Sequence, residues 1–177
     1  MADKTSNIIE FTIVYNRFKG YLFNYVKKMV NNTIVAEDII QGVVLKFYEN
    51  IETIKNKEHC EFWLFKTARN DVYNYYRSRK VRREVYDNVE METIETPENE
   101  SVEYQYDQKE MHELIMKELN ALPAEQRECF LLKEYSGLSY KEIAELLEVN
   151  EELVKSRLFK VRKKITEKIT QVLFYGV

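Results

Sequence analysis

The fold is decided by residues 138–164, which read LSYKEIAELLEVNEELVKSRLFKVRKK. Ser139 and Glu142 form an S-x-x-E pattern, which is typical of a helix start because each side chain can bond the other residue's backbone N–H. The apolar residues after Ser139 have helical spacing, and Asn150 is a favourable N-cap for a second helix. The stretch therefore predicts a helix-turn-helix.

The second helix of this motif has a basic side. Val154, Leu158, Val161 and Ile165 recur at steps of four, three and four, so they form one buried row. The other residues face solvent or a ligand: Lys155, Ser156, Phe159, Lys160, Arg162 and Lys163. A tight helix pair with a projecting cationic helix has the geometry that enters a DNA major groove. The alternative is a short hairpin whose basic side is merely solvated.

Composition favours a helical protein of one or two small domains. The chain has 177 residues, of which 45% are hydrophobic and 32% charged, but only four Gly and two Pro. So few turn-forming residues favour long helices over an all-β fold. No apolar stretch approaches the roughly 20 residues of a membrane span, and residues 1–10 lack a signal-peptide pattern. We therefore expect a cytoplasmic protein that does not insert into membranes.

The sequence does not suggest an enzyme or a metal site. Cys60, Cys129, His59 and His112 are the only Cys and His residues, and they lack the paired spacing of a zinc site. We expect free thiols, as is usual in a reducing compartment. There is no phosphate-cradling glycine loop and no His–carboxylate constellation, so we expect no cofactor and no catalytic residues.

The charge is unevenly distributed, although the net charge is only −3. Residues 66–83 carry seven basic residues and one acidic residue, and residues 151–168 carry seven basic and three acidic. Between them, residues 84–118 carry twelve acidic residues and two lysines. Local charge matters more than the total for a polyanionic partner, so both basic segments are candidates for binding nucleic acid.

The N-terminal half also has helical periodicity. Residues 6–30 predict two consecutive helices with a break near Gly20, and residues 34–50 predict another helix. On that helix Asp38 and Gln41 are three residues apart, so they share one face. The apolar periodicity then stops over residues 51–61, which predicts a loop.

A strong helix is predicted over residues 62–79. Its apolar side consists of Trp63, Leu64, Ala68, Val72 and Tyr76. Its other side mixes cations, amides and an aromatic ring, which together suit phosphates, base edges and unstacked bases. The residues of that side are Lys66, Arg69, Asn70, Tyr73, Asn74 and Arg77.

The predicted fold class is all-α, with two small helical domains joined by an acidic linker. The first domain spans residues 1–83, and the linker spans residues 84–108 and contains Pro97. The second domain, residues 109–177, ends with the helix-turn-helix. Pro123 suits the first turn of a helix in this domain.

Taken together, these motifs resemble the compact, two-domain extracytoplasmic-function (ECF) type of bacterial sigma factor. VAEDIIQGVVLKFYE (35–49) is similar to the family's helix that holds core RNA polymerase. EFWLFKTARNDVYNYYRSRK (61–80) is similar to the helix that melts and reads the −10 element. Residues 121–165 resemble the domain that binds the −35 element. The resemblance implies a promoter-specificity subunit that aids strand opening and is not an enzyme.

The resemblance also implies a role for individual residues. Asp38 and Gln41 would contact the clamp helices of the polymerase largest subunit, and residues 55–61 would lie where the family captures a flipped base. The linker would thread the channel that later carries nascent RNA. The −10 residues would be Lys66, Arg69, Asn70, Tyr73 and Arg77. The −35 residues would be Lys155, Ser156, Arg157, Phe159 and Lys160. The implied partners are core RNA polymerase, promoter DNA and an anti-sigma factor.

Three positions depart from the family pattern. Gly20 replaces a frequent Pro, and Gly42 stands where Glu usually follows Gln. Glu148 occupies the turn between the last two helices, where Gly is usual, and a left-handed conformation would cost it about 1 kcal/mol. We expect the turn to form nonetheless. Two rival functions remain open: a helix-turn-helix regulator that acts without polymerase, and a module that only binds polymerase.

Overall fold

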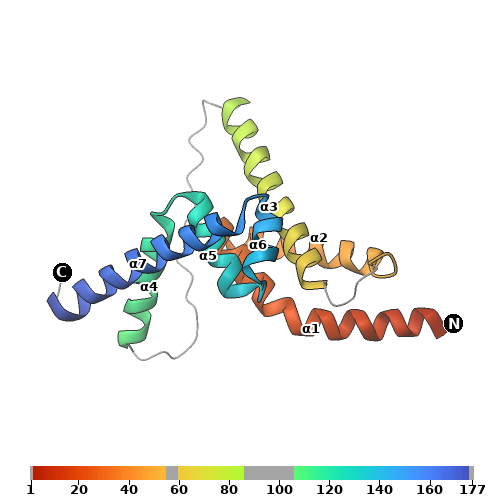
Figure 1. The fold of residues 1–177 in the computed structure, drawn as a ribbon. Coiled ribbons are helices and arrows are strands. Elements are labelled where there is room, and N and C mark those ends of the chain that lie inside the picture. The colour runs from red at the N-terminus through yellow and green to blue at the C-terminus, as the bar shows by residue number, and fades with distance from the viewer. Residues whose placement is uncertain (1, 55–59, 86–105, 176–177) are drawn as a thin grey trace. The chain divides into compact units, whose positions relative to one another are not determined.

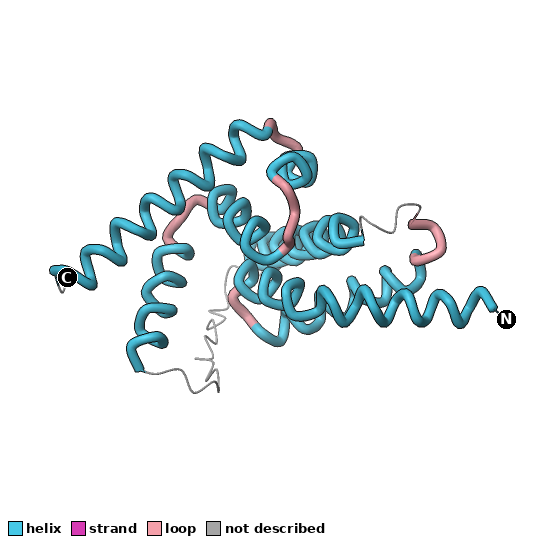
Figure 2. Tube along the Cα trace, turned by 60° about the horizontal axis from the view of Figure 1, so that its bottom comes forward, coloured by secondary structure: helices cyan, strands magenta, loops and turns pink. Residues whose placement is uncertain are grey.

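The computed structural model describes residues 2–54, 60–85 and 106–175, and all regular structure within them is helical (Figures 1 and 2). The prediction of an all-α fold is therefore confirmed. The helices are α1 (Ala2–Val30), α2 (Thr33–Asn50), α3 (Cys60–Val85), α4 (Tyr106–Asn120), α5 (Ala124–Tyr135), α6 (Tyr140–Leu147) and α7 (Glu151–Tyr175).

The chain divides into two compact units. The first contains α1–α3, and the second contains α4, α5 up to Glu134, α6 and α7. Helices α3 and α4 extend into the two ends of the predicted linker, since α3 runs to Val85 and α4 begins at Tyr106. The rest of that linker, residues 86–105, lies outside the described residues.

In the first unit each helix packs against the other two. The buried positions on each helix recur at steps of three, four or seven, apart from a few adjacent pairs, as expected for helices that bury one side. The core side chains include Leu22, Tyr25 and Val26 of α1, Ala36, Val43 and Phe47 of α2, and Leu64, Phe65, Ala68 and Val72 of α3.

Helix α1 is continuous, so the predicted break near Gly20 is wrong. Gly20 is helical, and a Cβ added to it would meet no atom within 4 Å. A glycine inside a helix costs about 1 kcal/mol relative to alanine. Phe18 and Leu22, on either side of it, are both buried. Burial of such side chains contributes about 1.5–3 kcal/mol each, which outweighs the glycine penalty.

Helices α1 and α2 are joined by two asparagines. Asn31 has a left-handed backbone with φ 52°, and its N–H donates to the Lys27 carbonyl at 2.8 Å. Asn32 is the N-cap of α2, and its side chain accepts from the Val35 N–H at 3.0 Å. These bonds satisfy polar groups at both helix ends, so α1 can end and α2 can begin with two residues between them.

In the second unit α7 packs against α4 and α6. Leu119, Leu122 and Val161 form a buried cluster between α4, the residues that follow it and α7. Side chains packed around the cluster are Ile115, Met116, Phe130 and Ile165. Pro123 lies just before α5, and its carbonyl accepts from the N–H groups of Gln126 and Arg127.

The turn between α6 and α7 uses a left-handed glutamate. Glu148 has φ 56° and ψ 43°, and the Val149 N–H donates to the Ala144 carbonyl at 3.0 Å. Helices often end with a residue in this left-handed conformation, and that residue is usually glycine. The expectation that the turn forms despite Glu148 is confirmed, and its backbone conformation is strained for a residue with a Cβ.

We predict that Glu148→Gly stabilises the protein by about 1 kcal/mol, because glycine adopts this conformation without steric cost. Urea unfolding followed by circular dichroism measures the change. Glu145→Gly is the matched control, since Glu145 is an exposed residue inside α6. There the same substitution should destabilise by about 1 kcal/mol. Equal effects of both substitutions would contradict the argument.

Candidate functional site

The starts of α6 and α7 are capped as predicted. Ser139 accepts from the Glu142 N–H at 3.2 Å, and the Glu142 carboxylate accepts from the Ser139 N–H at 2.8 Å. The Asn150 side chain accepts from the Leu153 N–H at 2.8 Å. Because both helix starts are capped by side chains, the two helices begin at defined residues on either side of a short turn.

Helix α7 buries one side and exposes a row on the other. Val154, Leu158 and Val161 are buried. The row opposite them is exposed and includes an aromatic ring, since Phe159 keeps 68% of its surface accessible. We call this set the recognition row: Glu152, Ser156, Phe159 and Lys163.

The predicted −35 residues lie in or beside this row. Lys155, Ser156, Phe159 and Lys160 are exposed. Arg157 differs, since it is half-buried and lies on the side toward the buried row. Its guanidinium is close enough to act electrostatically on the buried Cys129 thiol. Four of the five side chains are therefore open to a ligand. Arg157 is less accessible, because part of it packs on the buried side of α7.

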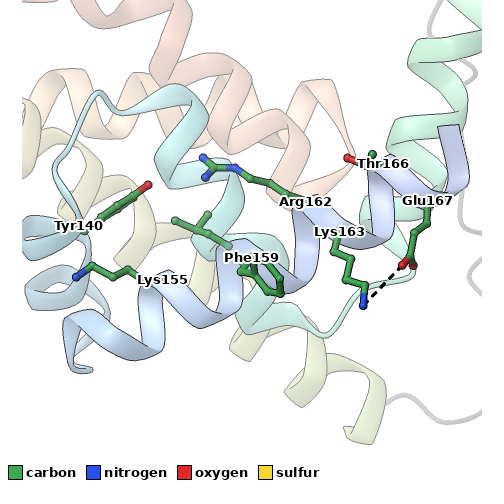
Figure 3. Close-up of a pocket in the computed structure, with 8 residues that line it drawn as sticks. Tyr140, Lys155, Phe159, Arg162, Lys163, Thr166 and Glu167 are labelled. Atoms are coloured by element: carbon green, nitrogen blue, oxygen red, sulfur yellow. Dashed lines mark ion pairs between the residues drawn. The ribbon is translucent and has the colours of Figure 1, made fainter. Parts of the chain in front are cut away.

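A shallow groove of about 360 Å³ runs along α7 beside the recognition row (Figure 3). Lys155, Phe159 and Arg162 line it from α7, and Tyr140 lines it from the start of α6. The Lys133 ammonium lies 5.0 Å from the centre of the Tyr140 ring, which helps to hold that ring. The groove is open, and its lining combines cations and aromatic rings with the Glu167 carboxylate, so it suits an extended ligand better than an enclosed small molecule.

Lys155 is held by two glutamates, which the sequence analysis missed. Its Nζ lies 3.1 Å from carboxylate oxygens of both Glu151 and Glu152. Hydrogen bonds with Glu151 and with Glu152 raise the pKa of Lys155. The signal was present in the sequence, because acidic residues three and four positions before a lysine share a helix face with it.

Helix α3 presents the predicted −10 residues as a second exposed row. Lys66, Asn70, Tyr73 and Arg77 are exposed and follow each other at steps of four, three and four. Arg69 is half-buried, and its guanidinium lies 4.7 Å from the centre of the Tyr73 ring. This row can offer an aromatic face, amide groups and positive charge to a single strand. Of the predicted base-capturing loop, residues 55–59 lie outside the described residues.

Helix α2 exposes a third row, of which the sequence analysis found only part. Asp38 and Gln41 are exposed as predicted. They lie between large apolar side chains that the prediction missed, namely Ile34, Leu45 and Tyr48, which are 69%, 58% and 48% exposed. The five follow each other at steps of four, three, four and three, so their spacing could have revealed the row. We call this set the α2 row.

Contacts between α2 and α3 fix the two rows relative to each other. The Lys46 ammonium lies 2.8 Å from the Asp71 carboxylate. The Phe47 and Trp63 rings pack with centroids 5.7 Å apart. Asp71 is the single acidic residue of the basic segment 66–83, and this ion pair neutralises it.

Cys129 of α5 contacts the backbone of α7. It is fully buried, and its Sγ lies 3.8 Å from the Val154 carbonyl, to which it donates. Burial raises the pKa of the Cys129 thiol to about 11. Cys60 is also buried and free. In the part of the chain that the structure describes, no three His, Cys, Asp or Glu side chains are grouped as a metal site requires.

Comparison with known proteins shows the family of this chain. The protein-family model for sigma-70 region 2 matches residues 14–82, and the family model for sigma-70 region 4 matches residues 112–165. Together the two matches span well over half of the chain. The chain belongs to the sigma-70 family of sigma factors. It therefore directs RNA polymerase to promoters as a transcription initiation factor and is not an enzyme.

Individual relatives agree with the family. The ECF RNA polymerase sigma-E factor of Haemophilus influenzae is 25% identical over 174 residues, covering 92% of this chain and 89% of that protein. The sigma factor SigZ of Bacillus subtilis is 25% identical over 154 residues, covering 87% and 84%. The fold of this sigma factor is similar to that of RpoE from Bartonella quintana, solved with the anti-sigma factor NepR. The TM-score is 0.69 at 22% identity, covering 96% of this chain and 97% of that one.

The region 2 match lies within the first unit, and the region 4 match lies in the second except for residues 135–138. The region 2 match covers most of α1, all of α2 and most of α3. The region 4 match begins inside α4 and ends inside α7, beyond the recognition row. None of the described helices of this sigma factor is both long and apolar enough to cross a membrane.

We predict that the buried Cys129 thiol is nearly inert in the folded sigma factor. A pKa of about 11 in place of 9.0 lowers the thiolate fraction near neutral pH by about 100-fold. In a Cys60→Ala variant, where Cys129 is the only thiol, alkylation by iodoacetamide should be slower by at least that factor than after unfolding in urea. A native rate close to the unfolded rate would contradict the structure.

The same thiol should make stability depend on alkaline pH. The folded pKa of Cys129 lies above the unfolded one, so its contribution is full below about pH 9 and is lost as the pH rises toward 11. The Cys60→Ala variant should lose stability over this range more steeply than the Cys60→Ala/Cys129→Ala double variant. Parallel curves would show that Cys129 makes no such contribution.

We predict a coupling free energy of about 0.5–1 kcal/mol between Lys46 and Asp71, because the Asp71 side chain is only 18% exposed. A double-mutant cycle of alanine substitutions, measured by urea unfolding, gives this value. Lys163 and Glu167 are the comparison pair, since both are more than 60% exposed and their charged atoms are 3.8 Å apart. Their coupling should not exceed about 0.3 kcal/mol.

Proposed function

We propose that the three exposed rows divide the work of promoter recognition. The α2 row binds core polymerase, the α3 row binds the opened −10 strand, and the recognition row of α7 reads the −35 element. One observation carries this proposal: each of these helices buries one side and leaves the opposite side exposed with chemistry that suits its partner.

The α2 row suits a protein partner. Protein interfaces are built around buried apolar anchors with polar groups that set orientation. Ile34, Leu45 and Tyr48 provide such anchors, and Asp38 and Gln41 provide the polar groups. Their steps of three and four match the groove of a partner helix, so the clamp helices of the polymerase largest subunit are the proposed partner.

The α3 row suits an opened strand more than a duplex. Opening DNA costs on the order of 1.4 kcal/mol per base-pair step. Stacking of an unpaired base on an aromatic side chain contributes about 1–3 kcal/mol. Tyr73 offers such a ring, flanked by Arg69, while Asn70 can bond base edges. Lys66 and Arg77 on the same row would bind phosphates.

The second unit suits duplex DNA. A helix-turn-helix places its second helix in the major groove, and α7 exposes Lys155, Ser156, Phe159 and Lys160 for that purpose. The first unit, to about residue 83, would then hold polymerase and the −10 strand, and the second, from about residue 109, would hold the −35 duplex. The protein would act in the cytoplasm. An anti-sigma factor is a proposed regulator, since the similar RpoE was solved with one.

The test is reconstitution with core polymerase and a promoter identified by mapping transcript starts. Leu45→Asp should weaken polymerase binding about tenfold or more, because it places a charge among the apolar anchors of the row. Lys160→Ala should leave polymerase binding unchanged and lower −35-dependent initiation severalfold, since it removes a phosphate contact. Sizing chromatography and transcript yield measure the two effects.

The control is Lys168→Ala, a basic residue of α7 beyond the region 4 match, which should affect neither readout. If the wild-type protein forms no complex with core polymerase, the proposal fails. Tight binding of an operator duplex without polymerase would favour the rival helix-turn-helix regulator. Polymerase binding without promoter-dependent transcription would favour the interaction module.

A further inference from the structure

The recognition row begins with an acidic residue, which is unexpected on a surface that meets DNA. Glu152 stands first in the row, one turn before Ser156, and 83% of its side chain is exposed. A carboxylate gains nothing from phosphates, because like charges repel. An exposed glutamate here opposes general affinity for DNA, and only a hydrogen-bond donor on the DNA would favour a contact with it.

In the major groove each base pair offers one such donor, and the base sequence decides which strand carries it. A carboxylate can only accept hydrogen bonds. The donors that bases present in the major groove are the N4 amino group of cytosine and the N6 amino group of adenine. In helix-turn-helix proteins the N-terminal residues of the second helix contact base edges. Glu152 is the second residue of α7, so it lies where such a contact is made.

Lys155 restricts the carboxylate of Glu152. The Lys155 Nζ is 3.1 Å from the Glu152 carboxylate and 3.1 Å from that of Glu151. This shared cation limits the rotamers of both glutamates and offsets part of their charge. The two differ in exposure, since the Glu151 side chain is 44% exposed. Glu151 is thus the more shielded partner of Lys155, and Glu152 is the one open to a ligand.

We propose that Glu152 determines base specificity in the −35 element, by accepting a hydrogen bond from the exocyclic amino group of a cytosine or an adenine. This inference rests on the proposed function of α7 as the −35 reader. Lys155 acts as a positioning residue, which holds the Glu152 carboxylate through their ion pair. Guanine and thymine at the same place present acceptors, so they would leave the carboxylate without a donor.

The experiment uses polymerase holoenzyme containing the full chain and a promoter library randomised in the −35 element. Wild-type holoenzyme should prefer cytosine or adenine at one position by about tenfold or more. In Glu152→Ala that preference should fall to within about twofold. Glu151→Ala is the matched control, because it removes the same charge and the other partner of Lys155. It should keep the wild-type preference.

Two results would overturn the inference while leaving the proposed function intact. Loss of the preference in Glu151→Ala but not in Glu152→Ala would show that the wrong glutamate was chosen. Equal gains in promoter affinity for both variants, with the base preference unchanged, would show that Glu152 acts through charge alone. A wild-type holoenzyme without preference at any −35 position would instead overturn the role of α7 itself. Circular dichroism of both variants checks that α7 is intact.

Discussion

One-sided burial of long helices is the constraint on which every surface of this sigma factor depends. Burying Val154, Leu158 and Val161 sets the rotation of α7 about its axis. Turning the helix by one residue, about 100°, would expose these side chains at a cost of about 1.5–3 kcal/mol each. The recognition row is therefore held in place by the residues behind it. The same reasoning applies to α2 and α3, whose buried and exposed rows also lie on opposite sides.

The sequence predicted features that depend on neighbouring residues and missed those that depend on packing. The capping box at Ser139 and the left-handed turn at Glu148 are local, and both are present. The predicted break at Gly20 is absent, because burial on either side outweighs a local preference. The ion pair between Lys46 and Asp71 joins two helices through their packing, so no spacing rule could reveal it. For the candidate site, helix periodicity predicted which polar side chains are exposed, except Arg69 and Arg157, but the apolar part of the α2 row was missed.

The departure from the family pattern at Gly42 has no cause inside the protein. A Cβ at this position would meet no atom within 4 Å, and the backbone there is helical. Packing would therefore accept the family's usual glutamate. What distinguishes this chain is its surface, where the α2 row relies on Ile34 and Leu45 beside Asp38 and Gln41. The proposed assignment of the α2 row to polymerase would place the effect of Gly42 in a binding surface and not in the core.

The packing of Trp63 gives this protein a built-in optical label. Trp63 is the only tryptophan of the chain, and its ring lies 5.7 Å from that of Phe47. Its emission therefore reports on the surroundings of α3 in the first unit, while helices α4–α7 contribute no indole signal. Fluorescence and circular dichroism can thus be followed side by side in the unmodified protein. Tryptophan fluorescence reports on the first unit, and circular dichroism reports on the helices of both units. Separate melting of the two units would therefore appear as two different melting curves.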